Sequence, residues 1–98
     1  MALINPDEVA RRVKELPGWT AESAAIRRQF TFPSFPDALA FVVRVGFVAE
    51  HADHHPDLLI SYKKVTVTYS THSEGGVTAK DFAGAQSADD IARALGGG

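Results

Sequence analysis

The sequence predicts an α+β domain in which a four-stranded antiparallel sheet carries three helices on one face, in the chain order α-β-β-α-β-β-α. Three observations lead to this prediction. Two pairs of short apolar segments are each followed by a segment with helical character, another helical segment precedes the first pair, and 98 residues are enough for one domain. Two hairpins, each followed by a helix, favour an antiparallel sheet with its helices on one side.

The first helix is expected over residues 6–16. Asn5 is a good N-cap residue, proline suits the first helical position, and Glu8 stands where its carboxylate would complete a capping box. Pro17 ends the helix because proline cannot continue one.

The first strand pair follows this helix. A short strand around residues 19–20 is expected to pair with a segment in which Ile26, Phe30 and Phe32 alternate with polar residues. Alternation with a period of two is typical of a strand with one buried face. The three apolar side chains should therefore point into the core.

The second helix is expected to run from Pro36 to about His54, with Ser34 as its N-cap. Its central part is apolar in nearly every direction, and a helix of this kind is buried on more than one side. In so small a domain one side should face the sheet and another a partner subunit, so the sequence predicts a homo-oligomer. Pro56 stops the helix, which should leave His54 in the last turn and His55 already extended.

The second strand pair is expected over residues 58–62 and 65–71. The later strand alternates cleanly, and His72 should continue its polar face. Thr78 then caps the last helix, with Asp81 at the capping-box position.

Composition is that of an ordinary globular domain, with 45% hydrophobic residues and a net charge of −2. There is no basic stripe for nucleic acid, and no apolar run approaches the roughly 18 residues of a membrane span. The absence of cysteine excludes disulfides and thiolate metal sites. We expect one cytoplasmic domain, residues 1–98, without nucleic-acid or membrane partners and with residues 1–4 and 96–98 frayed.

All four histidines lie between residues 51 and 72, and histidine is the side chain best suited to proton transfer near neutral pH or to binding a metal. His51, His54 and His55 would share one face of an unbroken helix, as zinc ligands do. Pro56 weakens the metal interpretation because it draws His55 out of the helix. General acid–base catalysis is the alternative.

Strand order favours that alternative. His55 leads into one strand of the second pair and His72 leaves the other, so an antiparallel hairpin should bring His54, His55 and His72 to one edge of the sheet. Glu50 lies four residues before His54 on the helix and is expected to accept a hydrogen bond from its imidazole, fixing the tautomer. His51 is interpreted as a bystander.

Three motifs combine histidines and carboxylates at fixed spacings. They are Glu50-x-x-x-His54-His55-Pro56-Asp57, Ser70-Thr71-His72 and Gly76-Val77-Thr78-x-x-Asp81. Together they resemble the pterin-4a-carbinolamine dehydratase family, and the resemblance covers about residues 5 to 95.

The resemblance implies a 4a-hydroxytetrahydrobiopterin dehydratase, a hydro-lyase without a cofactor or metal that converts 4a-hydroxytetrahydropterin to quinonoid dihydropterin in tetrahydropterin recycling. It also implies assembly as dimers or dimers of dimers, and an aromatic amino acid hydroxylase as the pathway partner that makes the hydroxylated pterin. Carried over to this sequence, the family's site comprises the catalytic His54, His55 and His72 and the supporting Glu50, Pro56 and Asp81.

The chemistry agrees with an acid–base site. Loss of the 4a-hydroxyl as water needs a proton donor at that oxygen and removal of the proton on N5, and imidazoles can do both. We take His54 and His72 as the acid–base pair. A non-catalytic dimerisation or assembly module of the same fold and a metal-binding domain remain as alternatives, which turnover of the carbinolamine and elemental analysis would distinguish.

Overall fold

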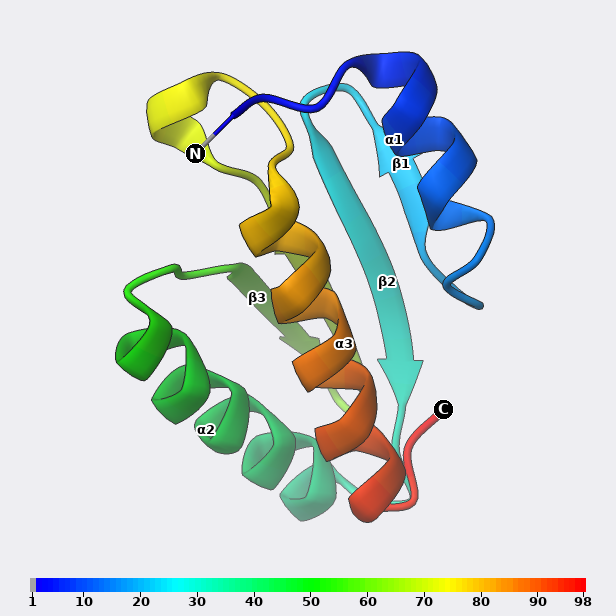
Figure 1. Ribbon diagram of the computed structural model, residues 1–98. Helices are drawn as coiled ribbons and strands as arrows, with labels where there is room; N and C mark the ends of the chain where they lie inside the picture. The colour runs from blue at the N-terminus through cyan, green and yellow to red at the C-terminus, as the bar shows by residue number, and fades with distance from the viewer. Residues whose placement is uncertain (1) are drawn as a thin grey trace.

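The computed structural model describes residues 2–98 and confirms the predicted fold class and element order (Figure 1). Residues 2–98 form the helices α1 (Pro6–Val13), α2 (Phe35–Ala52) and α3 (Ala79–Ala94). The strands are β1 (Thr20–Glu22), β2 (Ala25–Thr31), β3 (Asp57–Ser61) and β4 (Lys64–Tyr69), and a short 3-10 helix, η1 (His72–Glu74), lies between β4 and α3.

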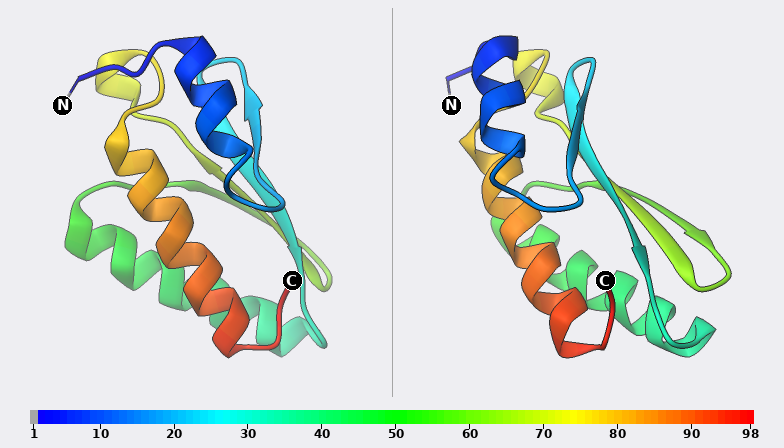
Figure 2. Two further views of the ribbon diagram at one scale, coloured as in Figure 1. Left: turned by 45° about the vertical axis from the view of Figure 1, so that its right-hand side comes forward. Right: turned by 90° about the vertical axis from the view of Figure 1, so that its right-hand side faces the viewer.

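The strands make one antiparallel sheet in the order β1-β2-β4-β3. β3 pairs with β4 from Asp57↔Thr68 to Ser61↔Lys64, so the start of β3 lies beside the end of β4. The helices cover one face of this sheet, as the right-hand view of Figure 2 shows. The other face carries no helix within residues 2–98, and its side chains are accessible from outside.

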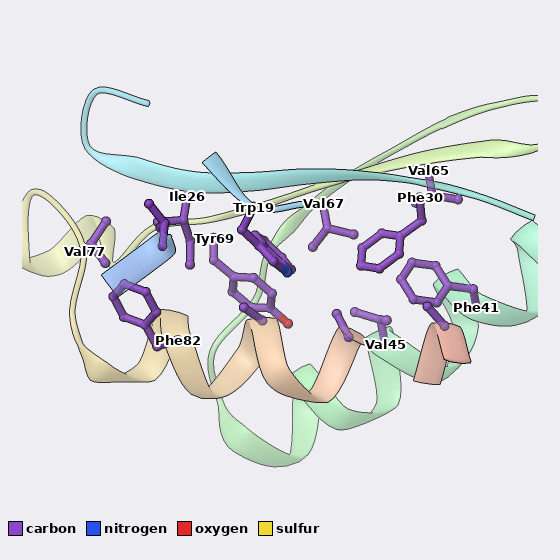
Figure 3. Packing of buried hydrophobic residues seen from close by; sticks show 14 of the residues in the cluster. Trp19, Ile26, Phe30, Phe41, Val45, Val65, Val67, Tyr69, Val77 and Phe82 are labelled. Carbon is purple, nitrogen blue, oxygen red and sulfur yellow. The ribbon is translucent and has the colours of Figure 1, made fainter. Parts of the chain in front are cut away.

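The core fills the space between the sheet and the helices (Figure 3). The predicted alternation is confirmed, because Ile26 and Phe30 of β2 and Val65, Val67 and Tyr69 of β4 all point into the core and are buried. Burying a side chain of this size contributes roughly 1.5–3 kcal/mol. The intervening residues of β4 face the open side of the sheet. The same alternation determines on which side of the sheet each site residue lies.

Helix caps at the two ends of the chain follow the prediction in part. The Asn5 Oδ1 atom accepts a hydrogen bond from the Glu8 N–H at 2.9 Å, and Thr78 and Asp81 form a complete, reciprocal capping box. The predicted capping box at Glu8 is wrong, since its carboxylate instead accepts a hydrogen bond from the Arg11 guanidinium one turn later. An ion pair at this helical spacing competes directly with the reach back to the N-cap.

The end of α2 differs from the prediction. Asp53 adopts the left-handed conformation (φ 52°, ψ 42°), and the N–H groups of Asp53 and His54 donate to the carbonyls of Glu50 and Ala49. This is a Schellman arrangement, in which a left-handed residue closes a helix. The helix therefore ends at Ala52, before the proline, and the expectation that His54 occupies the last turn is wrong.

The C-terminal residues run beside the end of β2. Gly98 exchanges two backbone hydrogen bonds with Thr31, at 2.9 and 3.1 Å. Gly97 passes so close to the Phe32 ring that a Cβ atom there would lie 2.3 Å from a ring carbon. The lack of a side chain at Gly97 thus allows the C-terminal backbone to pass close to the Phe32 ring. In the part of the chain that the structure describes, no helix has the length and apolar character needed to cross a bilayer.

Candidate active site

A buried carboxylate joins the two chain segments that carry the predicted histidines. Asp81 lies in the first turn of α3, and its side chain is completely inaccessible to solvent. The Nε2 atom of His54 is 2.6 Å from Asp81 Oδ1, and the Thr71 hydroxyl donates to Asp81 Oδ2 at 2.8 Å. The Asp81 carboxylate therefore binds both His54, which directly precedes His55, and Thr71, which directly precedes His72.

The carboxylate also determines the tautomer of His54. An ionised carboxylate only accepts hydrogen bonds, so the His54 Nε2 atom carries the proton and donates it. When His54 is neutral, its Nδ1 atom is then the nitrogen with the free lone pair. Asp81 Oδ2 accepts a second hydrogen bond from the Thr78 N–H at 2.9 Å. Asp81 thus has its predicted capping role and orients His54 as well.

Glu50 pairs with His55 rather than with His54. Its Oε1 atom lies 2.8 Å from His55 Nε2, and both side chains are largely in solvent, at 79% and 54% exposed. The predicted Glu50–His54 hydrogen bond is wrong. The left-handed turn at Asp53 takes His54 off the helix face that Glu50 occupies, and Asp81 holds its Nε2 atom. Each of the two adjacent histidines has its own carboxylate.

His54 stacks on Tyr69, with ring centroids 5.9 Å apart and an interplanar angle of 19°. Burial, and to a smaller extent the negative charge of Asp81, raise the pKa of Tyr69 to about 12, so its phenol is neutral at physiological pH. Both rings line a small, mainly apolar hollow of about 120 Å³, which we name the His54 hollow. Its other walls are Val48, Ala49, Ala52, Lys80, Ala83, Gly84 and Ser87.

His72 begins η1 and is exposed. It lines a more open hollow of about 400 Å³ on the face of the sheet away from the helices, which we name the His72 hollow. Its other walls are Glu22, Ser23, Ala24, Ala25, Arg27, Asp57, Thr68 and Ser70. Small-molecule sites generally occupy about 300–1,000 Å³, so the His72 hollow has the volume of a binding site and the His54 hollow does not.

The three predicted histidines thus share one edge of the sheet but not one hollow. Asp81 links the segments, while strand alternation sends His54 toward the helices and His72 toward the open face. Residues 2–98 contain no group of three or more histidine, aspartate or glutamate side chains arranged to hold a metal ion. His51 is exposed in the last turn of α2, and Pro56 directly precedes β3.

The sequence interpretation missed the contacts of Tyr69 and Thr71. Both continue the buried alternation of β4, so their side chains point toward α3 rather than toward the open face. A hydroxyl at a buried strand position requires a hydrogen-bond partner, and that requirement was the signal available in the sequence. For the Thr71 hydroxyl that partner is Asp81, which comes from a different element, α3.

Comparison with known proteins identifies the family to which the chain is similar. A family model described as pterin 4 alpha carbinolamine dehydratase matches residues 2–91. A curated relative from Roseiflexus castenholzii, named "Putative pterin-4-alpha-carbinolamine dehydratase", is 51% identical over 90 residues, which is 92% of this chain and 97% of the relative. A relative of the same name from Mycobacteroides abscessus is 46% identical, covering 91% of this chain and 95% of its own.

Solved structures give the same result. A transcriptional coactivator/pterin dehydratase from Brucella melitensis superposes with a TM-score of 0.88 at 35% identity, over 93% of this chain and 99% of that one. A pterin dehydratase-like protein identified as a RuBisCO assembly factor in the alpha-carboxysome has a TM-score of 0.64 at 19% identity, covering 76% and 86%, and shares the fold alone. On the family model and these relatives, the chain belongs to the pterin 4 alpha carbinolamine dehydratase family.

Proposed function

We propose that this protein converts 4a-hydroxytetrahydropterin to quinonoid dihydropterin and water by proton transfer through histidines, downstream of an aromatic amino acid hydroxylase. The observation that carries the proposal is the Asp81 carboxylate, which holds the segments of His54–His55 and His72 at one edge of the sheet. Family membership supports the substrate class. The reaction breaks the C4a–O bond, protonates the departing oxygen and removes the proton on N5, so it requires one acid and one base.

The His72 hollow is the better place for the pterin. Its volume suits a bicyclic ring, and Arg27, Asp57 and Ser70 bring a guanidinium, a carboxylate and a hydroxyl to its walls, as the polar edge of a pterin requires. His55 has the same strand parity as Asp57, and the β3–β4 register continued by two residues places it opposite Ser70. His55 therefore belongs to the same face of the sheet.

On this geometry we assign the acid and base roles to His55 and His72. His55 thus replaces His54, which the sequence-based hypothesis paired with His72. The His55 imidazole is half exposed, and its hydrogen-bond partner within residues 2–98 is the exposed Glu50 carboxylate, which leaves it free to reach a substrate. His54 is committed to Asp81 and lines the smaller hollow, and in this proposal it supports the pair. Pro56 keeps the backbone between His55 and β3 extended.

A dehydratase assay with synthetic 4a-hydroxytetrahydropterin tests the proposal, with the formation of quinonoid dihydropterin followed by ultraviolet absorbance. We expect His55→Ala and His72→Ala each to lose roughly 100-fold or more in kcat, the usual contribution of a general acid or base. His54→Ala should also lose rate, because it unpairs Asp81. His51→Ala changes an exposed histidine in the last turn of α2, and this control should keep the wild-type rate.

Two outcomes would contradict the proposal. Wild-type rates in both His55→Ala and His72→Ala would remove the acid–base assignment. A folded wild-type protein without any turnover would favour the binding or assembly module that the motifs left as an alternative.

We also infer that the outer side of α2 is covered by a second copy of this chain. Phe35, Leu39, Val43 and Phe47 follow one another at intervals of four residues and form an exposed apolar row, which we name the α2 stripe. Phe47 is 75% exposed. Contiguous apolar patches of this kind mark protein–protein contacts, and a helix face of one chain can pair with the same face of another across a twofold axis.

A further inference from the structure

We propose that Thr71 is a positioning residue, which acts through Asp81 to fix the spacing between His55 and His72, an inference that rests on the proposed function. Thr71 is buried just beyond the end of β4. Its hydroxyl oxygen lies 2.8 Å from Asp81 Oδ2 and 2.8 Å from the Thr78 hydroxyl. The hydroxyl thus bridges the strand end that carries His72 and the start of α3.

Donor chemistry fixes the direction of each hydrogen bond. The Asp81 carboxylate only accepts, so the Thr71 hydroxyl must donate its single proton to Asp81. At its second contact Thr71 is then the acceptor, and the Thr78 hydroxyl must donate. The Thr78 oxygen accepts in turn from the Lys80 N–H, at 3.3 Å. The chain of donors therefore runs in one direction, from the backbone of α3 to Asp81.

The other end of the chain is His54, which donates from Nε2 to Asp81 Oδ1. We name His54, Asp81 and Thr71 the carboxylate clamp. Its atoms are nearly dry, since the His54 side chain is 12% exposed and Asp81 is fully buried. Hydrogen bonds in such surroundings are stronger than in water, and their loss is correspondingly costly. Within residues 2–98, every buried side-chain nitrogen and oxygen has a hydrogen-bond partner, so the clamp is complete.

The clamp lies immediately next to the proposed acid–base pair. His54 precedes His55 and Thr71 precedes His72, so the clamp ties the two backbones together beyond the last β3–β4 pair, Asp57↔Thr68. A displacement of about 1 Å in a reacting group can cost roughly 100-fold in rate. The walls of the His72 hollow are not part of the clamp. Loss of the Thr71 hydroxyl should therefore lower kcat and leave KM nearly unchanged.

The experiment compares Thr71→Val, Thr71→Ser and Thr66→Val. Thr66→Val makes the same chemical change on the opposite face of β4. The measurements are kcat and KM in the dehydratase assay, and imidazole ¹H–¹⁵N NMR spectra that report which nitrogen of His54 carries the proton. In the wild type we expect the Nε2–H form, with a proton protected from exchange. Thr71→Val should lose about tenfold or more in kcat and the protection of that proton.

Thr71→Ser keeps the hydroxyl and should restore both measurements, while Thr66→Val should match the wild type. A Thr71→Val protein with wild-type kcat and His54 signal would overturn the inference, and so would equal losses in the valine and serine variants. Should Thr71→Val fail to fold, the wild-type spectrum decides, because a neutral His54 protonated on Nδ1 excludes the clamp. The spectra need no turnover, so failure of the clamp and failure of the proposed activity are observed separately.

Discussion

Tyr69 connects the core of the protein with the candidate site. Its ring packs near Trp19 on the core side, at a centroid distance of 6.3 Å, and stacks on His54 on the other. Burial is the main reason that its pKa rises to about 12, because a phenolate at this position would lose its hydration. The negative charge of Asp81 adds to the same effect.

The raised pKa of Tyr69 predicts a loss of stability at alkaline pH. The folded protein holds the phenol proton more tightly than the unfolded chain, whose tyrosine has its ordinary pKa of 10.0. The resulting stabilisation is complete below the unfolded pKa and is lost as the pH rises from there through about 12. Urea unfolding at about pH 8 and about pH 11.5 should show that the wild type loses roughly 2 kcal/mol more than Tyr69→Phe. Equal losses in the two proteins would contradict the shift.

Sequence patterns identified the residues around the site better than they identified the pairs that these residues form. Glu50 was matched with His54 by helical spacing, which holds only while the helix continues. The helix ends at a left-handed aspartate, Asp53, and aspartate in that conformation has no reliable sequence signature. The actual partner of His54, Asp81, is 27 positions away in the chain, and only the packing of α3 on the sheet reveals it.

At the scale of whole elements, caps and alternation located the helices and strands because both signals are local. Asn5 and Thr78 act as N-caps as predicted, and the buried residues of β2 and β4 follow the predicted period of two. The 3-10 helix η1 was not predicted, since it arises where Thr71 bridges to Gly76 across a short loop. This loop turns His72 onto the open face directly after Thr71 has turned inward.

Two glycines inside helices predict opposite effects of the same substitution. A Cβ atom at Gly84 of α3 would lie 2.5 Å from the Tyr69 ring, whereas a Cβ atom at Gly46 of α2 would have no heavy atom of the described residues within 4 Å apart from its chain neighbours and the adjacent backbone of its own helix. Alanine is favoured over glycine in a helix by about 1 kcal/mol. Gly46→Ala should therefore raise the free energy of unfolding by up to about 1 kcal/mol, and Gly84→Ala should lower it by about 1–3 kcal/mol through overpacking.

Urea unfolding of both variants and the wild type at neutral pH measures these two effects. Because the substitution is the same, each variant is the control for the other. A Gly84→Ala protein that is more stable than the wild type would show that α3 does not depend on this close contact with the β4 residue beneath it.

At the scale of the whole molecule, α2 carries two separate features. Its C-terminal end carries Glu50 and the turn that leads to His54, while the α2 stripe runs along its outer side. A chain of this size buries a limited fraction of its surface, and association is a common way to bury more. Because the stripe lies away from the His72 hollow, covering it should leave the proposed pterin site open.

The proposed association through the α2 stripe predicts that one substitution in the stripe dissociates the oligomer. Phe47→Asp places a charge on its most exposed member, and we expect light scattering or sedimentation to change from a dimer or tetramer to a monomer. Tyr62→Asp is the control, since Tyr62 is also an exposed aromatic residue, at 68%, but lies in the β3–β4 turn. Far-ultraviolet circular dichroism confirms that both variants are folded. A monomeric wild type, or a Phe47→Asp protein of wild-type mass, would show that the α2 stripe is not the surface at which copies of this chain associate.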